Sequence, residues 1–362
     1  MTTAAADQRV LMTGNEALAE AAIRAGLDAY FGYPITPQNE LTAYMATHMP
    51  ERGRVFVQSE SEVAAINMVF GASATGKRTM TTSSSPGISL MQEGISYLAA
   101  GELPCVVANI MRGGPGLGNI APSQSDYFQA TRGGGHGDYR TIVLAPATVQ
   151  EMADLTMDAF DLADKYRMVV MILGDGILGQ MMEPLSFREY RRPTLPAKDW
   201  AVTGAKSRPQ NIVRTLWLED GMLERRNQIL QETYLRIEKD EPRVQSEQLE
   251  DADVVVVAYG MMARVARVAV QQARDQGIAA GLIRPITLWP FPTQFIRNAA
   301  NSNRTFLTVE MSCGQMVDDV RLAVNGRNEV HFFGRAGGGI PTVPQILDEI
   351  IRLARGQKGA PQ

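Results

Sequence analysis

Two acidic residues, Glu60 and Glu62, stand directly before an alanine-rich stretch whose apolar spacing predicts a helix ending at Ala74. Side chains two positions apart point to different sides of a helix, so one carboxylate should face the interior and the other solvent. Glu62 opens the helix and is the candidate for the interior. A partly desolvated carboxylate needs a hydrogen-bonding partner, and beside an aromatic nitrogen it can exchange a proton. The alternative is a helix N-terminal charge stabilised by the macrodipole, and the residues alone leave both interpretations open.

Hydroxyl groups in two further segments could contact a ligand. Between Gly32 and Pro37 the chain reads Gly-Tyr-Pro-Ile-Thr-Pro, and its two prolines favour an extended, rigid loop that can hold Thr36 at fixed geometry. A plain turn with a helix cap is the alternative. Between Thr81 and Gly87 the chain reads Thr-Thr-Ser-Ser-Ser-Pro-Gly. Hydroxyls and main-chain N–H groups at a helix start can bind an anion or a polar ring, although such loops are equally common as connectors.

A cationic residue, Arg112, follows the apolar strand predicted over Pro104–Met111 and opens a glycine-rich region. Nine glycines fall between residues 101 and 140, and long loops of this kind after α/β strands are usually functional. Arg112 is the natural partner for a carboxylate. His136, in the same region, could carry a proton, but a loop histidine without that role is the simpler interpretation.

Two glycine motifs are weaker signals. Gly174-Asp175-Gly176 matches the start of the diphosphate motif of thiamine enzymes, but the asparagine that completes the motif is missing around residues 199–206. Asp175 is therefore interpreted as part of a turn at a strand end and not as a magnesium ligand. The segment 334–339 lacks both the P-loop lysine and the dinucleotide-binding spacing.

The elements that must position these residues alternate between strand and helix. Continuous apolar strands such as Met168–Leu173 predict a parallel sheet with helices on both faces, hence an α/β fold. Thr148 and Glu151 have the spacing of a capping box at the start of one helix. Four of the predicted helices are Gln38–Met49, Ser61–Ala74, Ile88–Ala100 and Thr148–Lys165.

Composition divides the chain of 362 residues into three parts. Residues 1–190 hold 14 of the 19 methionines and most glycine clusters, and form the main α/β domain. Residues 191–251 form a charged connecting arm, because 17 of the 45 positions from 207 to 251 are charged. Residues 252–362 return to apolar strands and amphipathic helices and form a smaller α/β domain.

Charge and cysteine content exclude several classes of protein. Thirty-five basic and 39 acidic residues give a net charge of −4, which argues against a nucleic-acid partner. Two cysteines cannot ligate an iron–sulfur cluster by themselves. The longest apolar runs are six residues, far below the roughly 18 needed to span a membrane. No secretory signal precedes the first strand, so we expect a cytoplasmic protein.

Together, the Tyr33–Pro37 loop, the Glu60-x-Glu62 helix, the Ser83–Gly87 loop and the strand ending at Arg112 resemble the α subunit of multisubunit 2-oxoacid:ferredoxin oxidoreductases. The closest match is the branched-chain (2-oxoisovalerate) type. The likeness covers nearly the whole chain and includes the segment Arg284–Pro290. It implies a thiamine diphosphate-binding fold, with a pyrimidine-binding domain over residues 1–190 and a transketolase C-terminal-like domain over residues 252–362.

The resemblance also implies an active site divided between chains. The pyrimidine half of thiamine diphosphate would lie on this chain, and the diphosphate with its Mg²⁺ on a β subunit. A γ subunit and a ferredoxin-like subunit would complete the complex, with 4Fe-4S clusters on partner chains. The reaction would be CoA-acylating oxidative decarboxylation of a 2-oxoacid (EC class 1.2.7), giving acyl-CoA and CO2, with ferredoxin as electron acceptor.

The resemblance also implies roles for the residues at matching positions. Glu62 matches the family's glutamate that hydrogen-bonds N1′ of the aminopyrimidine. Thr36 matches the threonine that contacts the 2-oxoacid, and Arg112 matches the arginine that binds its carboxylate. No metal ligand is expected on this chain. The other expected cofactor-binding residues are Tyr33, Pro34 and Ser84.

Several alternatives stay open at this point. The glycine-rich stretch 113–119 does not identify the substrate side chain, so phenylglyoxylate and 2-oxoglutarate compete with a branched-chain 2-oxoacid. A non-catalytic structural α subunit is a further alternative, although Glu62, Thr36 and Arg112 are all present. A transketolase-like or decarboxylase chain would need its own complete diphosphate motif. A free-standing nucleotide-binding protein would need a fingerprint that this sequence lacks.

Overall fold

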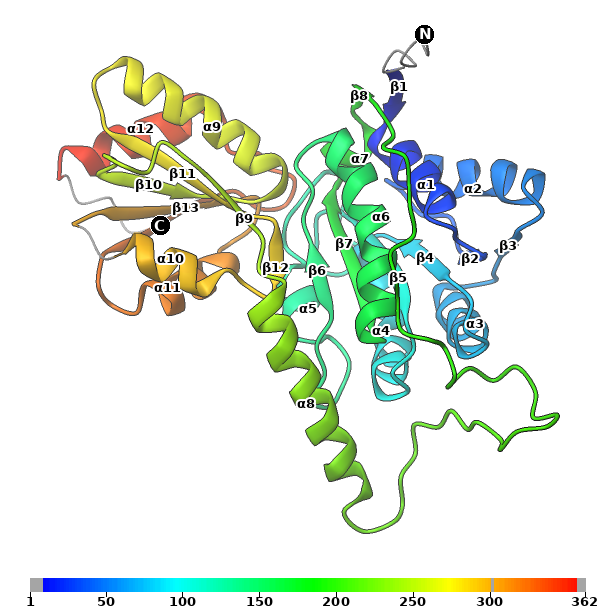
Figure 1. Cartoon of the computed structure of the whole chain (residues 1–362). Helices are drawn as coiled ribbons and strands as arrows, with labels where there is room; N and C mark the ends of the chain where they lie inside the picture. Colours follow the sequence, from blue (N-terminus) through cyan, green and yellow to red (C-terminus); the bar gives the residue numbers. More distant parts are fainter. Residues whose placement is uncertain (1–8, 301–302, 357–362) are drawn as a thin grey trace, which may run out of the picture.

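The computed structural model describes residues 9–300 and 303–356. The expectation that no secretory signal is present concerns Met1–Gln8, which lie outside the described residues. Most strands belong to a seven-stranded and a five-stranded sheet, which lie beside each other with helices around them (Figure 1). None of the helices in the described part combines the length and apolar character needed to cross a membrane.

The seven-stranded sheet has the order β12-β6-β7-β5-β4-β2-β3 and is parallel except where β12 pairs with β6. Its central strands β4, β5, β6 and β7 are buried at every residue, which requires cover on both faces. The expected α/β fold is confirmed. The strands are β2 (Ala29–Gly32), β3 (Val55–Gln58), β4 (Thr79–Ser83), β5 (Cys105–Met111), β6 (Ile142–Leu144), β7 (Val169–Asp175) and β12 (Thr287–Trp289).

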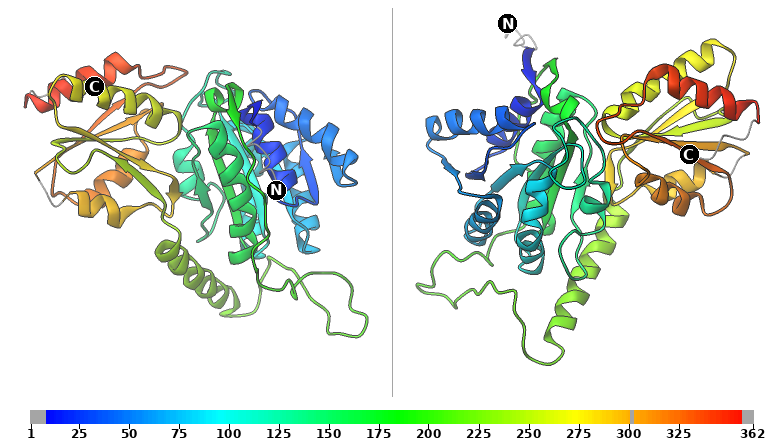
Figure 2. Two further views of the ribbon diagram at one scale, coloured as in Figure 1. Left: turned by 45° about the horizontal axis from the view of Figure 1, so that its top comes forward. Right: turned by 180° about the vertical axis from the view of Figure 1, so that it is seen from behind.

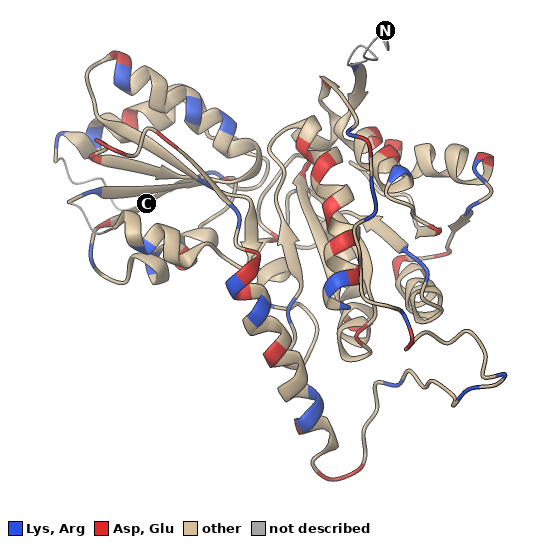
Figure 3. Cartoon of the chain, viewed as in Figure 1, with Lys and Arg blue, Asp and Glu red and all other residues tan. Residues whose placement is uncertain are grey.

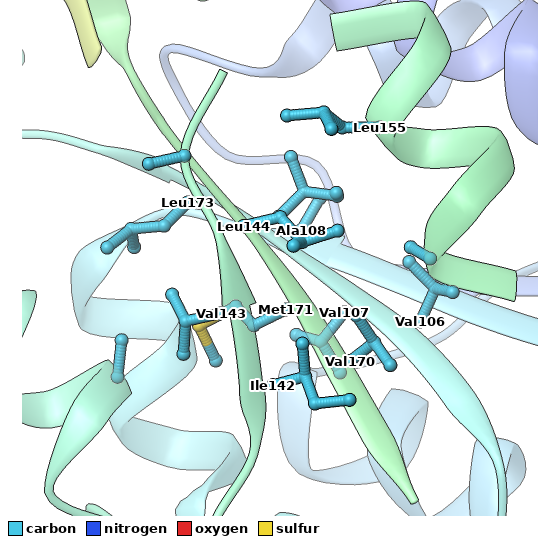
Figure 4. Close-up of a cluster of buried hydrophobic side chains, with 14 of the residues drawn as sticks. Val106, Val107, Ala108, Ile142, Val143, Leu144, Leu155, Val170, Met171 and Leu173 are labelled. Atoms are coloured by element: carbon cyan, nitrogen blue, oxygen red, sulfur yellow. The ribbon is translucent and has the colours of Figure 1, made fainter. Parts of the chain in front are cut away.

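The core of this sheet consists of apolar side chains from adjacent strands. Val107, Val143 and Met171 come from β5, β6 and β7, and Leu155 of α6 lies above the same strands (Figure 4). Buried apolar surface of this extent is the main stabilising contribution and holds the strand ends at fixed positions.

Helices pack in pairs against the sheet. α1 packs on α6 and α3 packs on α4. Three helices begin within one residue of the sequence prediction, but α4 begins three residues earlier, with Pro86 in its first turn. The helices are α1 (Gly14–Arg24), α2 (Asn39–Glu51), α3 (Glu62–Ala74), α4 (Ser85–Ala100), α5 (Tyr127–Thr131), α6 (Val149–Tyr166) and α7 (Gly176–Gln180).

The capping box predicted at the start of α6 is half right. Thr148 Oγ1 accepts a hydrogen bond from the Glu151 N–H at 3.1 Å. The Glu151 carboxylate does not return this bond to Thr148. It accepts instead from the Ala147 N–H at 2.8 Å and binds the Arg284 guanidinium. A tertiary ion pair has replaced the second half of the local motif.

The five-stranded sheet has the order β14-β13-β10-β11-β9, parallel except for β9 at its edge. α9 packs on α12, and α10 on α11. The strands are β9 (Val244–Glu247), β10 (Val254–Val257), β11 (Ala280–Pro285), β13 (Thr305–Glu310) and β14 (Val330–Gly334). The helices are α9 (Gly260–Asp275), α10 (Thr293–Ala299), α11 (Met316–Val324) and α12 (Val343–Ala354).

Between β8 (Met182–Leu185), which pairs with β1 (Val10–Thr13), and α8 (Met222–Asp240) the chain forms neither helix nor strand. Both views in Figure 2 show its second half running away from the body of the molecule. Its first half lies over α6, whose acidic residues follow one another along the helix (Figure 3). Basic residues pair with that acidic row: Arg188 with Asp158, Arg78 with Asp161 and Asp164, and Lys198 with Asp164.

We propose the same three-part division of the chain as the sequence suggests, at residues 190 and 251. Two strands cross these limits. β9 lies in the arm but extends the five-stranded sheet, and β12 follows residue 251 but extends the seven-stranded sheet. A strand of the C-terminal unit thus completes the sheet of the first unit, and a strand of the arm completes the sheet of the C-terminal unit.

Candidate active site

The candidate residues lie on loops that follow β2, β3, β4 and β5. These four strands are parallel, so their carboxyl ends meet at one edge of the sheet. Because of this topology, residues that are 21 (Glu62 and Ser83) and 76 (Thr36 and Arg112) positions apart in the sequence meet in one place.

Glu62 is the first residue of α3, and its side chain is buried, with 5% of the residue exposed. Ser61 caps the helix by accepting a hydrogen bond from the Ala64 N–H at 3.2 Å. Within the described residues the Glu62 carboxylate accepts one hydrogen bond, a long one of 3.4 Å from Ser83 Oγ. Glu60 is exposed. The expectation that one acid faces the interior and the other faces solvent is confirmed.

Gly87 keeps the start of α4 close to this carboxylate. A Cβ at this position would lie 2.4 Å from Glu62 Oε1 and 2.0 Å from Ser83 Oγ. No side chain larger than hydrogen fits without moving one of these two groups.

Ser84 stands at the N-cap position of α4 but makes no side-chain cap bond. Its hydroxyl is completely buried and has no hydrogen-bond partner among the described residues. Buried hydroxyls are normally paired, so an unpaired one beside Ser83 marks a place where a ligand or water can bind.

Arg112 directly follows β5 and is 7% exposed. Its Nη1 donates to the Thr36 carbonyl at 3.0 Å and its Nη2 to the Leu117 carbonyl at 3.2 Å. Its Nε has no partner, and no ion pair is formed with any described acidic residue. The structure thus brings Arg112 and Thr36 together. Thr36 itself is half-buried, and its hydroxyl accepts a hydrogen bond from Asn39 Nδ2 at 3.2 Å.

Tyr33 and Pro34 lie on the same loop as Thr36 but are exposed. The loop is held from below by Gln38, which is fully buried and accepts a hydrogen bond from Thr82 Oγ1 at 2.7 Å. Gln38 was not among the residues expected in the site. Its position one residue after two closely spaced prolines was the available signal.

A second row of polar residues lies behind Arg112. Asp126 Oδ2 accepts hydrogen bonds from Ser85 Oγ at 2.5 Å and from Asn109 Nδ2 at 2.9 Å. Burial raises the pKa of Asp126, and these two hydrogen bonds lower it in part. Ser85 belongs to the hydroxyl segment that the sequence singles out, whereas Asn109 was not expected, although an asparagine inside the buried apolar strand β5 was a visible anomaly.

The weaker motifs have structural roles here. Asp175 caps α7 by accepting from the main-chain N–H groups of Ile177 and Leu178, both at 3.0 Å, and burial raises its pKa. The Gly337 carbonyl accepts from Asn119 Nδ2 at 3.0 Å, so the 334–339 loop rests on the loop after Arg112. His136 is exposed.

Two family models match the chain. The one described as "Pyruvate flavodoxin/ferredoxin oxidoreductase, thiamine diP-bdg" matches residues 20–272, and the one described as "Pyruvate:ferredoxin oxidoreductase core domain II" matches residues 252–346. The first match covers more than half of the chain. This chain belongs to the pyruvate flavodoxin/ferredoxin oxidoreductase family. Thiamine diphosphate is the cofactor of the matching family domain.

Curated relatives of this oxidoreductase subunit are similar over almost its full length. Ketoisovalerate oxidoreductase subunit VorB of Methanothermobacter marburgensis is 52% identical, with 95% of this chain and 97% of the relative covered. 2-Oxoglutarate synthase subunit KorA of Methanothermobacter thermautotrophicus is 37% identical, with 96% of this chain and all of the relative covered. The expected resemblance to 2-oxoacid:ferredoxin oxidoreductases, and with it the oxidoreductase class, is confirmed.

Among solved structures, the 2-oxoglutarate:ferredoxin oxidoreductase from Magnetococcus marinus, with 2-oxoglutarate, coenzyme A and succinyl-CoA bound, has a TM-score of 0.82 at 27% identity. The match covers 96% of this chain and 65% of that longer chain. A split-gene transketolase, as an inactive tetramer, has a TM-score of 0.58 at 14% identity and covers 96% of this chain and 99% of its own. The second likeness shows a shared fold alone, in agreement with the expected thiamine diphosphate-binding fold.

Proposed function

We propose that this chain is the α subunit of an oxidoreductase that decarboxylates a branched-chain 2-oxoacid such as 2-oxoisovalerate and forms acyl-CoA. The observation that carries the proposal is the Arg112 guanidinium, which is buried, meets no carboxylate within the described chain and leaves Nε unpartnered. A buried charge without a counter-ion is costly, so an anion should bind there. The carboxylate of a 2-oxoacid has the charge and the planar pair of oxygens that a guanidinium binds best.

The residues around Glu62 fit the pyrimidine half of thiamine diphosphate. The Glu62 carboxylate retains acceptor capacity, the Ser84 hydroxyl lacks a partner, and the absence of a Cβ at Gly87 lets the start of α4 approach Glu62 and Ser83. When bound, the cofactor supplies the nucleophilic carbon and the electron sink for decarboxylation. Glu62 would hold a proton at a ring nitrogen, while Arg112 and Thr36 would orient the substrate. Tyr33 and Pro34 would line the mouth of the same site.

The choice of a branched-chain substrate is supported by the curated relatives. The VorB relative is 52% identical, compared with 37% for the KorA relative. Phenylglyoxylate and 2-oxoglutarate are the competing candidates.

The rest of the active site would come from other subunits. The curated relatives are named as subunits, which supports partner chains in general. We propose a β subunit that holds the diphosphate and Mg²⁺, and γ and ferredoxin-like subunits that carry 4Fe-4S clusters. The two cysteines of this chain, one buried and one exposed, support the placement of clusters elsewhere. Coenzyme A would take the acyl group and ferredoxin the electrons, in the cytoplasm.

The test is co-expression with the partner subunits followed by a substrate panel. The complex should reduce ferredoxin or a viologen only with a 2-oxoacid and coenzyme A, and the isolated chain should not. We expect the highest kcat/KM with 2-oxoisovalerate, ahead of phenylglyoxylate, pyruvate and 2-oxoglutarate. A complex that prefers 2-oxoglutarate would overturn the substrate assignment, and one with no 2-oxoacid-dependent reduction would overturn the proposed function as a whole.

A further inference from the structure

We infer that Asp126 is a positioning residue through which the C-terminal α/β unit holds Arg112 and the start of α4 in place. This inference rests on the proposed function, because it assigns Arg112 to the 2-oxoacid carboxylate. It goes beyond that function by giving the C-terminal unit of this chain a part in substrate binding.

The side chain of Asp126 does not follow its local preference. Aspartate directly before a helix normally accepts a hydrogen bond from that helix, yet Asp126 makes no cap bond to α5. One of its oxygens, Oδ2, turns instead to Ser85 Oγ (2.5 Å) and Asn109 Nδ2 (2.9 Å). A tertiary network has outcompeted the local cap.

That network ends at the main chain of Arg112. Ser85 Oγ donates to Asp126 and at the same time accepts from the Arg112 N–H at 3.0 Å. Asn109 lies three residues before Arg112 on β5. Asp126 therefore holds the end of β5 at two points, and it also holds the first residue of α4.

The main chain on both sides of Asp126 is bound by the C-terminal unit. Gln315, directly before α11, donates from Nε2 to the Ser125 carbonyl at 2.7 Å and accepts at Oε1 from the Phe128 N–H at 2.8 Å. Gln124 exchanges hydrogen bonds with Met311, at 2.9 Å and 3.0 Å. The segment that carries Asp126 is therefore placed by residues that follow β13, and Asp126 transmits this placement to Arg112.

The experiment compares Asp126→Asn with Asp126→Ala in the assembled complex. A single oxygen of Asp126 accepts both hydrogen bonds, so the oxygen of asparagine can replace it. For Asp126→Asn we expect a KM for the 2-oxoacid within about twofold of wild type. For Asp126→Ala, Ser85 and Asn109 lose their acceptor, and we expect this KM to rise about tenfold while the KM for coenzyme A stays unchanged.

Two further variants test the link to the C-terminal unit. Gln315→Ala should raise the KM for the 2-oxoacid several-fold, in the same direction as Asp126→Ala. Gln129→Ala is the matched control, because Gln129 lies on α5, three residues after Asp126, and among the described residues its side chain donates only to Ser89 Oγ. The KM of the Gln129→Ala complex for the 2-oxoacid should equal that of wild type.

Hydrogen exchange gives a readout that needs neither cofactor nor substrate. In the isolated chain, Asp126→Ala should speed exchange in the peptide that contains the Arg112 amide, and Asp126→Asn should not. The inference is overturned if Asp126→Ala keeps the wild-type KM and exchange, or if Asp126→Asn is impaired as much as Asp126→Ala. If the wild-type complex shows no 2-oxoacid-dependent activity, the proposed function fails, whereas the exchange result still tests the positioning network by itself.

Discussion

A buried glutamate lies near the carboxyl end of a strand in each of the two sheets. The two carboxylates differ in how many hydrogen bonds the fold provides to them. Glu310, at the end of β13, accepts from Ser312 Oγ and from the main-chain N–H groups of three residues at the start of α11. Glu62, after β3, accepts one long hydrogen bond from Ser83. Both side chains are buried, so burial does not distinguish them. Glu310 is satisfied by the fold, whereas Glu62 keeps its acceptor capacity for a ligand.

The buried arginines repeat this contrast. Arg284 forms two hydrogen bonds of 2.7 Å with the Glu151 carboxylate, and Arg78 pairs with Asp161 and Asp164. Arg112 meets only carbonyl oxygens and retains a free Nε. A buried charge that is already paired belongs to the framework, and one that is not paired points to the site.

The sharpest test of this contrast is the same substitution at both glutamates. Glu62→Gln removes the carboxylate that would hold a proton, so we expect turnover of the assembled complex to fall by roughly 10²- to 10⁴-fold with assembly intact. Size-exclusion chromatography measures assembly, and viologen reduction measures turnover. Glu310→Gln should instead lower thermal stability, because an amide NH2 would face main-chain N–H donors. The expected loss in the free energy of unfolding is about 1–3 kcal/mol. If Glu62→Gln retains turnover, the chain is a structural subunit and the mechanistic assignment is lost.

The arginines allow a parallel test with a smaller effect. Lysine cannot reproduce the fork of a guanidinium. For Arg112→Lys we expect kcat/KM for the 2-oxoacid to fall about 10- to 100-fold, from the loss of about 1.5–3 kcal/mol of charge-assisted hydrogen bonding. Arg284→Lys should leave KM unchanged and lower the melting temperature. An equal effect of both variants on KM would contradict the contrast.

Gly87 and Gly71 form a matched glycine pair. A Cβ at Gly87 would press on Glu62 and Ser83, whereas a Cβ at Gly71, within α3, would meet nothing within 4 Å. We expect Gly87→Ala to reduce turnover about tenfold, by a displacement that costs about 1–3 kcal/mol. Gly71→Ala should stabilise the isolated chain by about 0.5–1 kcal/mol. Steady-state kinetics and thermal unfolding decide, and normal turnover in Gly87→Ala would show that the close approach is not needed.

Ser84→Ala should have the smallest effect on activity, and it should affect cofactor binding without lowering the stability of the chain. Its hydroxyl is buried without a partner, so its removal should leave the thermal stability of the isolated chain equal or slightly higher. Binding of thiamine diphosphate to the complex should weaken several-fold, because the lost hydrogen bond is worth about 1 kcal/mol. Calorimetric titration of the complex measures the second effect. A loss of chain stability with unchanged cofactor affinity would show that Ser84 is a framework residue.

Two features of this protein could be predicted from the sequence because they depend on local chemistry. The continuous apolar strands predicted a sheet covered on both faces, because apolar side chains on both sides of a strand must be buried. The spacing of Glu60 and Glu62 predicted that one acid would be buried and the other exposed. The structure places Glu62 at the first position of α3 and Glu60 before its N-cap, Ser61. Both expectations depend on short-range geometry, and both are confirmed by the structure.

Other features depend on which distant segments come together, and the sequence does not encode these contacts locally. Thr148 and Glu151 have capping-box spacing, yet Arg284, more than 130 residues away, takes the Glu151 carboxylate. Asp126 has the position of a helix cap, yet Ser85 and Asn109 take its carboxylate. In each case a buried, charge-assisted partner outcompetes a local one.

The residue types and spacings by themselves determined the α/β class and the candidates Glu62, Thr36 and Arg112. Only the tertiary structure decided which charged groups remain unpaired after folding. That property cannot be read from spacing, because the partners of a buried side chain are set by parallel strands that bring distant loops to one edge of a sheet. The physical difference between Glu62 and Glu310, or between Arg112 and Arg284, therefore exists only in the folded chain.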